Sequence, residues 1–210
     1  EAGPVRLRLR VATDYPWEGR VDIEVEPSRD GAVAALNLRL PGWCDNADVR
    51  IDGHSESGAV DEARPGTGYV RLGRAWKRGE RVELSFDMPP TRVYAHPGVR
   101  MAAGKVALQR GPVVYCLEGV DHDVTPLSRV ALPATATIEA RHEPGLLGGV
   151  TVLEADAVAL DENDWNGLYR TRPPQTAPVR LRAVPYFTWD NREAGPMLVW
   201  LRETKEREDR

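Results

Sequence analysis

A period-two alternation of apolar and polar residues runs through the first half of the chain. The segments that carry it lie at residues 5–11, 21–25, 36–40 and 82–86. Successive side chains of a strand point to opposite faces, so the pattern predicts half-buried strands with one solvated face. In the first segment, the buried face would carry Leu7, Leu9 and Val11. Asp52-Gly53 is typical of a two-residue hairpin turn. We therefore expect an all-β protein.

The division of the chain is expected at Pro89-Pro90, because two adjacent prolines cannot donate to a strand ladder and stiffen the backbone. This predicts two antiparallel β-sandwich modules in tandem, residues 1–90 and 91–205, followed by a tail at 206–210. Strands of the second module are expected near residues 104–109, 112–117, 129–132, 136–140, 150–154, 178–184 and 197–202. Helix signals are weak: a single turn is expected at residues 156–163, and a frayed helix or a solvated tail at 203–210.

Composition excludes several classes of partner. Of the 210 residues, 41% are hydrophobic and 29% charged, and the net charge of -4 comes from acidic and basic residues mixed along the chain. Nucleic acid is not an expected partner because there is no basic stripe. No apolar stretch approaches the roughly 20 residues that span a bilayer, so no membrane partner is expected either.

The two cysteines, Cys44 and Cys116, do not form a disulfide framework or a zinc-ligand spacing. We expect two buried, reduced thiols, with the pKa of Cys116 raised by its apolar strand. The chain also lacks an Asn-x-Ser/Thr sequon and begins at Glu1, as a fragment would. The compartment therefore stays open, with the cytoplasm favoured.

Aromatic residues in three turns are the candidate binding residues, for carbohydrate or for another domain. Trp17 and Glu18 would place a flat ring beside a carboxylate, or Trp17 would pack over the end of a sandwich. Trp165 and Tyr169 fall in a long irregular stretch, where rings stack on sugars or on a partner surface. Trp189 offers the same choice, with Asn191 and Arg192 capping its turn.

A metal or catalytic site has weaker support. The cluster of Glu118, Asp121, His122 and Asp123 follows a predicted strand and is expected to be a solvated turn. Residues 161–167 superficially resemble a calcium loop, but Trp165 stands at a ligand position and no glutamate closes the loop. Neither a zinc motif nor a nucleophile motif is present. We therefore assign no catalytic residue and no metal ligand.

Four segments carry a family resemblance. They are residues 13–19 (TDYPWEG), 38–43 (LRLPGW), 107–118 (ALQRGPVVYCLE) and 185–192 (PYFTWDNR). Taken together and in this order, they resemble glycoside hydrolase family 127, the β-L-arabinofuranosidase-like enzymes. The resemblance implies the region C-terminal to an (α/α)6-barrel catalytic domain, folded as two β-sandwiches.

The same resemblance implies that the chemistry takes place in the barrel, where a zinc-held cysteine thiolate attacks the anomeric carbon with retention. Neither Cys44 nor Cys116 lies in a matching motif, so no cofactor is assigned to this chain. The leading hypothesis is a non-catalytic region that packs on the barrel and supports a homodimer. The alternatives are a stand-alone carbohydrate-binding module acting through Trp17 or Trp165, and an enzyme that uses Glu118 and Asp121.

Overall fold

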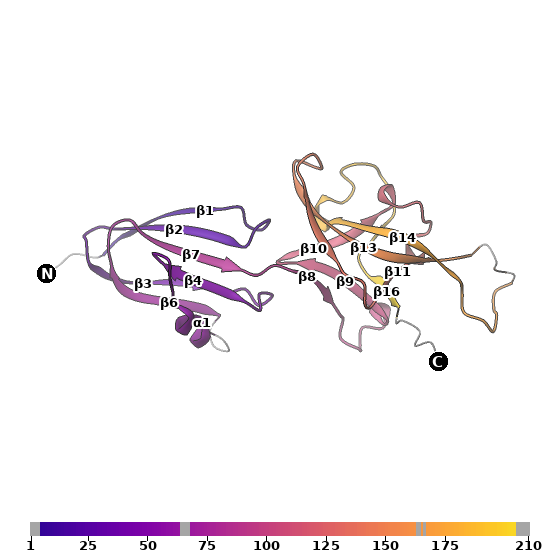
Figure 1. Cartoon of the computed structure of the whole chain (residues 1–210), viewed down its shortest axis with the longest axis horizontal. Helices are drawn as coiled ribbons and strands as arrows, with labels where there is room; N and C mark the ends of the chain where they lie inside the picture. The colour runs from indigo at the N-terminus through magenta and orange to yellow at the C-terminus, as the bar shows by residue number, and fades with distance from the viewer. Residues whose placement is uncertain (1–4, 64–67, 163–164, 166, 205–210) are drawn as a thin grey trace. The chain divides into compact units, whose positions relative to one another are not determined.

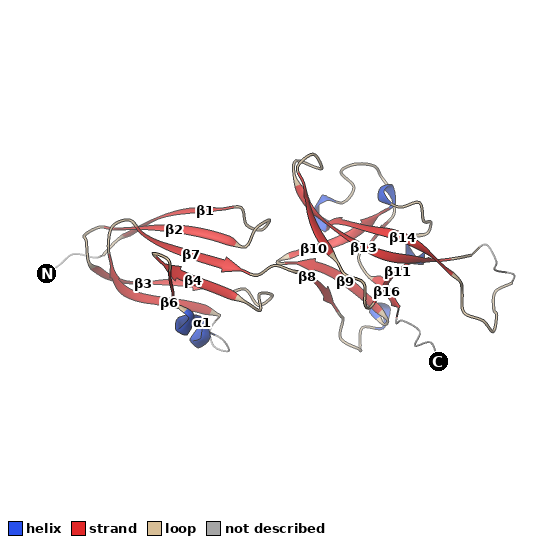
Figure 2. Ribbon diagram, viewed as in Figure 1, coloured by secondary structure: helices blue, strands red, loops and turns tan. Residues whose placement is uncertain are grey.

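The computed structural model describes residues 5–63, 68–162, 165 and 167–204. It divides the chain into two compact units, Glu1–Met88 and Pro89–Arg210. Strands form most of the regular structure in both units, and the described helices are short (Figure 2). The all-β prediction is confirmed. None of the described helices is long and apolar enough to cross a membrane.

The first unit has two antiparallel sheets (Figure 1). The larger sheet has the strand order β1-β2-β7-β4-β5, and the smaller sheet pairs β3 with β6. The strand bounds are β1(Leu7–Thr13), β2(Arg20–Pro27), β3(Ala32–Arg39), β4(Ala47–Ile51), β5(His54–Ser55), β6(Tyr69–Trp76) and β7(Glu80–Phe86), with the helix α1(Ser57–Ala63) between β5 and β6. Asp52 and Gly53 join β4 to β5 with positive φ angles of 47° and 82°, which confirms the predicted hairpin turn.

One apolar core lies between the two sheets of the first unit. Most of its buried side chains come from β2, β4 and β7 of one sheet and from β3 and β6 of the other, and α1 adds Val60. The register places Ile23 of β2 and Ile51 of β4 on either side of Val82, so these residues form one row across the sheet. Trp76 is fully buried in this core and donates an indole hydrogen bond to the Ala34 carbonyl at 3.1 Å.

The first strand departs from its predicted pattern. Leu9 and Val11 of β1 are 40% and 58% exposed, although the alternation predicts that they are buried. β1 is the edge of a five-stranded sheet, whereas the facing sheet has only two strands. The smaller sheet therefore covers the inner strands and leaves most of the apolar face of β1 in solvent.

The second unit is not the expected sandwich. Six strands pair in a closed ring, β10-β14-β13-β11-β16-β9, because β10 pairs with both β14 and β9. The bounds are β8(Pro90–Val93), β9(Lys105–Arg110), β10(Val113–Glu118), β11(Val130–Pro133), β12(Glu139–Glu143), β13(Val150–Leu160), β14(Thr176–Pro185), β15(Met197–Leu198) and β16(Leu201–Thr204), with the 3-10 turns η1(Arg100–Ala102), η2(Gly119–Asp121), η3(Leu127–Arg129) and η4(Tyr186–Thr188). Closure leaves no edge among the six ring strands, and their inward side chains form the core of a barrel.

Two further expectations for the second unit are corrected. The helical turn expected at 156–163 is wrong over its first five residues, because β13 continues to Leu160 and pairs with β14 as far as Thr176. Burial alternates from Ala155 to Leu160, as a strand packed on one face requires. The expected frayed helix from Glu203 begins instead as the end of β16. Residues 205–210, including the predicted tail, lie outside the described residues.

The position of Trp76 generates a stability prediction. Replacing it in Trp76→Ala removes a fully buried ring and is expected to destabilise the first unit by about 3–5 kcal/mol. Urea unfolding followed by far-UV circular dichroism measures this loss. Val33→Ala is the control, because Val33 lies on β3 but is 73% exposed, and it should change stability by less than about 0.5 kcal/mol. A loss below about 1 kcal/mol in Trp76→Ala would contradict its place in the core.

Candidate functional site

The site begins with β10, whose last four residues are all buried. Tyr115 and Leu117 belong to the barrel core. Cys116 and Glu118 alternate with them on the opposite face, yet are only 2% and 3% exposed, so another segment must cover that face. Residues 186–198 provide the cover, because η4 packs on β10 and β15 pairs with it.

Burial changes the titration of two β10 side chains. Loss of solvation raises the pKa of the Tyr115 hydroxyl to about 12. The same effect, reinforced by the nearby Glu118 carboxylate, raises the pKa of the Cys116 thiol to about 12. The predicted rise for Cys116 is confirmed, and a thiol with such a pKa is a poor nucleophile at neutral pH.

Glu118 connects β10 to the covering segment. One carboxylate oxygen accepts the backbone N–H of Asp190 at 2.9 Å, and the other accepts Arg192 Nε at 3.1 Å. The expectation of a solvated turn is therefore wrong for Glu118, although Asp123 of the same cluster is exposed. A buried carboxylate is stable only when its oxygens are paired, and both oxygens of Glu118 are paired here.

Arg192 also binds a second carboxylate. Its Nη1 donates to Asp121 Oδ1 at 2.8 Å, and its Nη2 contacts both Asp121 and Glu118. The hydrogen bond with Asp121, followed by that with Glu118, raises the pKa of Arg192 despite its partial burial. Arg192 therefore remains charged and joins η2 to the segment after β14.

His122 links this cluster to the backbone of β14. Its Nε2 accepts the backbone N–H of Arg182 at 3.2 Å, while its Nδ1 lies 2.8 Å from the Glu118 carbonyl. Because Nε2 accepts a hydrogen bond, the Nδ1–H tautomer of the ring satisfies both contacts. The sequence offered no sign of this role, because the ring binds backbone atoms of a strand 60 residues away.

The covering segment forms a rigid turn that carries three exposed rings. Thr188 Oγ1 donates to the Pro185 carbonyl at 2.6 Å, and Asn191 Nδ2 donates to the carbonyls of Thr188 and Trp189. The predicted capping of this turn is confirmed for Asn191 and is wrong for Arg192, whose side chain pairs with Glu118 and Asp121. The rings of Tyr186 and Trp189 stack with their centroids 6.5 Å apart.

We call Tyr186, Phe187 and Trp189 the aromatic turn. They are 45%, 60% and 40% exposed, respectively, even though the backbone beneath them is bound to Glu118 and Arg192. Exposed apolar rings on a well-ordered backbone are typical of contact surfaces, because little conformational entropy is lost when they bind.

Trp17 and Glu18 lie in the first unit, in the turn between β1 and β2. The backbone N–H groups of both residues donate to the Asp14 carbonyl, which makes this turn tight. A side chain at Gly19 would collide with the Phe86 backbone, since its Cβ would lie 2.0 Å from the Phe86 carbonyl oxygen. Trp17 is half-buried and Glu18 is exposed.

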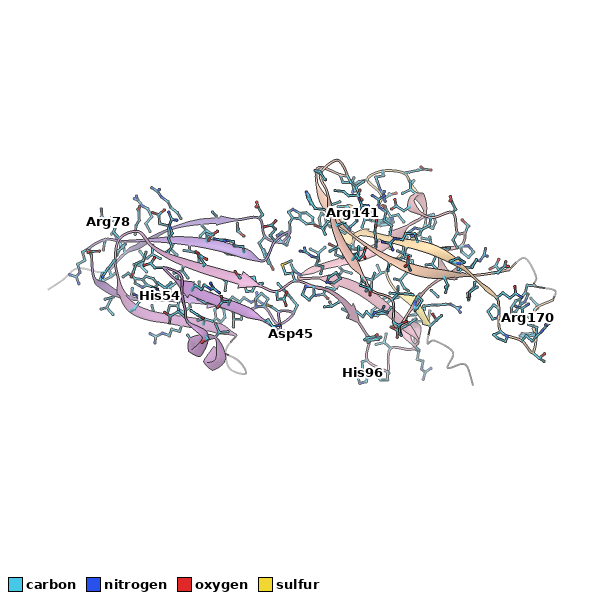
Figure 3. All side chains as sticks on the ribbon, in the orientation of Figure 1. Asp45, His54, Arg78, His96, Arg141 and Arg170 are labelled. Atoms are coloured by element: carbon cyan, nitrogen blue, oxygen red, sulfur yellow. The ribbon has the colours of Figure 1, made fainter. Side chains whose placement is uncertain are left out.

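Trp165 and Tyr169 lie in the loop between β13 and β14. The guanidinium carbon of Arg170, labelled in Figure 3, sits 4.0 Å from the centroid of the Trp165 ring. This cation–π contact holds the ring of Trp165, which is 37% exposed. Tyr169 is 91% exposed.

Within the second unit, the candidate residues do not form one site. The loop with Trp165 and Tyr169 precedes β14, and the aromatic turn follows it. A strand of ten residues spans roughly 30 Å, so the two groups occupy opposite ends of β14. The period-two pattern of a strand gives no sign that Arg192 pairs with Glu118 or that Tyr186 stacks on Trp189.

Among the described residues, no group of three or more His, Cys, Asp or Glu side chains could hold a metal ion. Cys44 lies in the first unit, where its Sγ donates to the Asn46 carbonyl, whereas Cys116 lies in the second unit.

Comparison with known proteins matches each unit to a separate domain. Residues 1–88 match the profile described as beta-L-arabinofuranosidase, GH127 middle domain, and residues 90–202 match the glycoside hydrolase family 127 C-terminal domain. Both domains belong to a carbohydrate-active hydrolase.

Individual relatives agree. The chain is 33% identical over 206 residues to the non-reducing end beta-L-arabinofuranosidase of Bifidobacterium longum subsp. longum, covering 93% of this chain and 30% of that protein. It is 43% identical, with a TM-score of 0.87, to a GH127 beta-L-arabinofuranosidase of Geobacillus stearothermophilus T6, covering 94% of this chain and 31% of that one. A further solved glycoside hydrolase is 31% identical, with a TM-score of 0.82, over 94% of this chain and 32% of its own.

The chain therefore belongs to glycoside hydrolase family 127, and it comprises the middle and C-terminal domains of that family. It spans about a third of the length of the relatives it matches. The family resemblance identified from the sequence is confirmed.

The buried carboxylate of Glu118 generates a second prediction. Glu118→Gln keeps the shape but removes the charge that pairs with Arg192, so we expect the second unit to lose about 3 kcal/mol. The backbone amide of Asp190 should also exchange its hydrogen faster, because its acceptor is weakened. Thermal unfolding and hydrogen exchange measure the two effects.

Glu139→Gln is the matched control for Glu118→Gln. Glu139 also pairs with an arginine, Arg180, at 3.3 Å, but its side chain is 68% exposed. Exposed pairs contribute little, so stability should change by less than about 1 kcal/mol. Equal effects of the two variants would contradict the special role of Glu118.

The raised pKa of Cys116 generates a third prediction. The unfolded thiol ionises near pH 9 and the folded thiol near 12, so its contribution to stability is full below pH 9 and is lost between pH 9 and 12. A Cys44→Ser variant leaves Cys116 as the single thiol. It should resist Ellman's reagent at about pH 8 and react fully in urea. Rapid labelling of the folded variant would show that Cys116 is accessible.

Proposed function

We propose that this chain is the non-catalytic middle and C-terminal region of a β-L-arabinofuranosidase-like glycoside hydrolase. In this proposal, it packs on and supports a catalytic domain of the same polypeptide. The single observation that carries it is that two family 127 domains account for residues 1–88 and 90–202, while the relatives are about three times as long. We also propose that the chain divides into two modules at Pro89-Pro90.

The whole protein's activity follows from the same proposal. We infer that it removes β-L-arabinofuranosyl groups from the non-reducing end of a glycan, as the name of the Bifidobacterium longum relative describes. Zinc and the nucleophilic thiol would belong to the catalytic domain, as the resemblance implies. Cys116 is unsuited to that role because its pKa is raised to about 12.

The aromatic turn is our proposed contact with the catalytic domain. Tyr186, Phe187 and Trp189 expose apolar rings close together in the sequence, and a contiguous exposed apolar patch often marks a contact surface. Large rings on a preorganised backbone often dominate the binding energy of an interface. The pairing of Glu118 with Arg192 supplies that preorganisation from within the second unit.

Binding in trans tests this proposal. The catalytic domain of the parent polypeptide is expressed separately and titrated with the 210-residue chain in a calorimeter. Phe187→Ala and Trp189→Ala should each weaken the complex by about tenfold or more, because a buried ring contributes over about 1 kcal/mol at an interface. In the whole enzyme, the same substitutions should lower the melting temperature while leaving the KM unchanged.

Met101→Ala is the control for the contact surface. Met101 is also apolar and lies in the second unit, where it is 83% exposed. Its replacement should leave binding within about twofold of the unsubstituted chain. No complex in trans, together with a melting temperature of the whole enzyme that is insensitive to both ring substitutions, would refute the proposed role of the aromatic turn.

A further inference from the structure

A hollow of about 640 Å³ opens at the end of the barrel where β13 leaves it. This volume falls in the range of about 300–1,000 Å³ that small-molecule sites occupy. Its walls come from η3, the end of β13, the loop after it and β16. The side chains that concern ligand chemistry are Ser128, Arg129, Asp161, Glu162, Trp165 and Arg202.

Trp165 contributes a flat ring to this wall. Its backbone N–H donates to the Glu162 carbonyl at 3.0 Å, so a turn positions the residue. A guanidinium group stacks on one face of a ring, and that of Arg170 lies 4.0 Å from the ring centroid. Trp165 as a whole is nevertheless 37% exposed, so part of the residue remains in contact with solvent. An aromatic surface suits the C–H face of a sugar.

Arg129 contributes hydrogen-bond donors that are already in place. Its Nε donates to the Leu160 carbonyl at 2.7 Å, and its Nη1 donates to the Thr125 carbonyl at 3.2 Å. These bonds hold the guanidinium against the wall, and a guanidinium group has five N–H donors in all. Glu162, whose carboxylate lies 3.6 Å from Arg129 Nε, provides acceptors beside those donors.

The charged side chains that line the hollow indicate which kind of ligand would fit it. Among the side chains that line the hollow, the two arginines Arg129 and Arg202 are matched by the two carboxylates of Asp161 and Glu162. Charges of both signs therefore lie side by side along this wall, so no single sign of ligand charge is favoured by the lining side chains. Sugar hydroxyls donate and accept hydrogen bonds together, which fits guanidinium and carboxylate groups side by side.

We propose that this hollow is a glycan-binding subsite for neutral saccharides, built on the second unit apart from the aromatic turn. It does not depend on contact with the catalytic domain. It would hold a glycan chain on the protein by stacking a sugar on Trp165 and binding hydroxyls through Arg129 and Glu162.

Calorimetric titration of the 210-residue chain tests this subsite. The probes are an L-arabinofuranosyl trisaccharide, xylotriose and, as the charged comparison, a galacturonic acid trisaccharide. We expect saturable binding of at least one neutral probe with a Kd of about 1 mM, and weaker binding of the acidic one. No saturation by either neutral probe at about 20 times that concentration, or tighter binding of the acidic probe, would overturn the proposal.

Substitutions locate the binding and separate it from the proposed function. Trp165→Ala should weaken the neutral saccharide at least about tenfold while circular dichroism and the melting temperature stay unchanged, because the ring lies on an exposed loop. Arg202→Gln, at an exposed position on β16, should weaken it about threefold or more. Unchanged binding by Trp165→Ala would overturn the subsite.

Phe187→Ala is the matched control, since it removes an exposed ring at the other end of β14. It should leave saccharide binding unchanged and weaken only the contact with the catalytic domain. Trp165→Ala should weaken saccharide binding and leave the contact with the catalytic domain unchanged. The two proposals therefore fail independently of each other.

Discussion

The strand β10 holds the second unit together, because it pairs with β9 on one side and with β14 on the other. This double pairing closes the ring of six strands and leaves none of the six with an open edge. Closure also determines which side chains of β10 face inward. Tyr115 and Leu117 fill the barrel, while Cys116 and Glu118 face outward and need a separate cover. The segment after β14 supplies this cover, so the position of the aromatic turn depends on the barrel beneath it.

Glu118 is the connection between the barrel and that cover. A carboxylate with 3% exposure would strongly destabilise the fold unless it were paired, and its pairing with Arg192 and the Asp190 amide also immobilises the turn. A rigid strand, β14, then separates the aromatic turn from the hollow beside Trp165. The two surfaces can therefore serve different partners, because each is built on an end of the same well-ordered element.

The turns whose geometry depends only on neighbouring residues could be predicted from the sequence. Asp52-Gly53 forms the expected hairpin because both residues adopt positive φ angles, and Asn191 caps its turn as its short polar side chain favours. The family resemblance rested on four short segments of sequence. Other expectations failed where a distant partner decided the outcome. Leu9 is exposed because the facing sheet is narrow, and residues 156–160 form a strand because β14 pairs with them.

The sequence by itself determined the all-β class, the family and the raised pKa of Cys116, since alternation, short motifs and apolar neighbours act within a few residues. Only the tertiary structure decided that the second unit closes into a barrel, that Glu118 is buried against Arg192, and that Trp165 lines a hollow with Arg129. Those features join residues that lie far apart in the chain, up to 74 positions in the case of Glu118 and Arg192. Alternation specifies which face of a strand is buried, but the strand's partners follow from packing of the whole chain, and no local pattern encodes them.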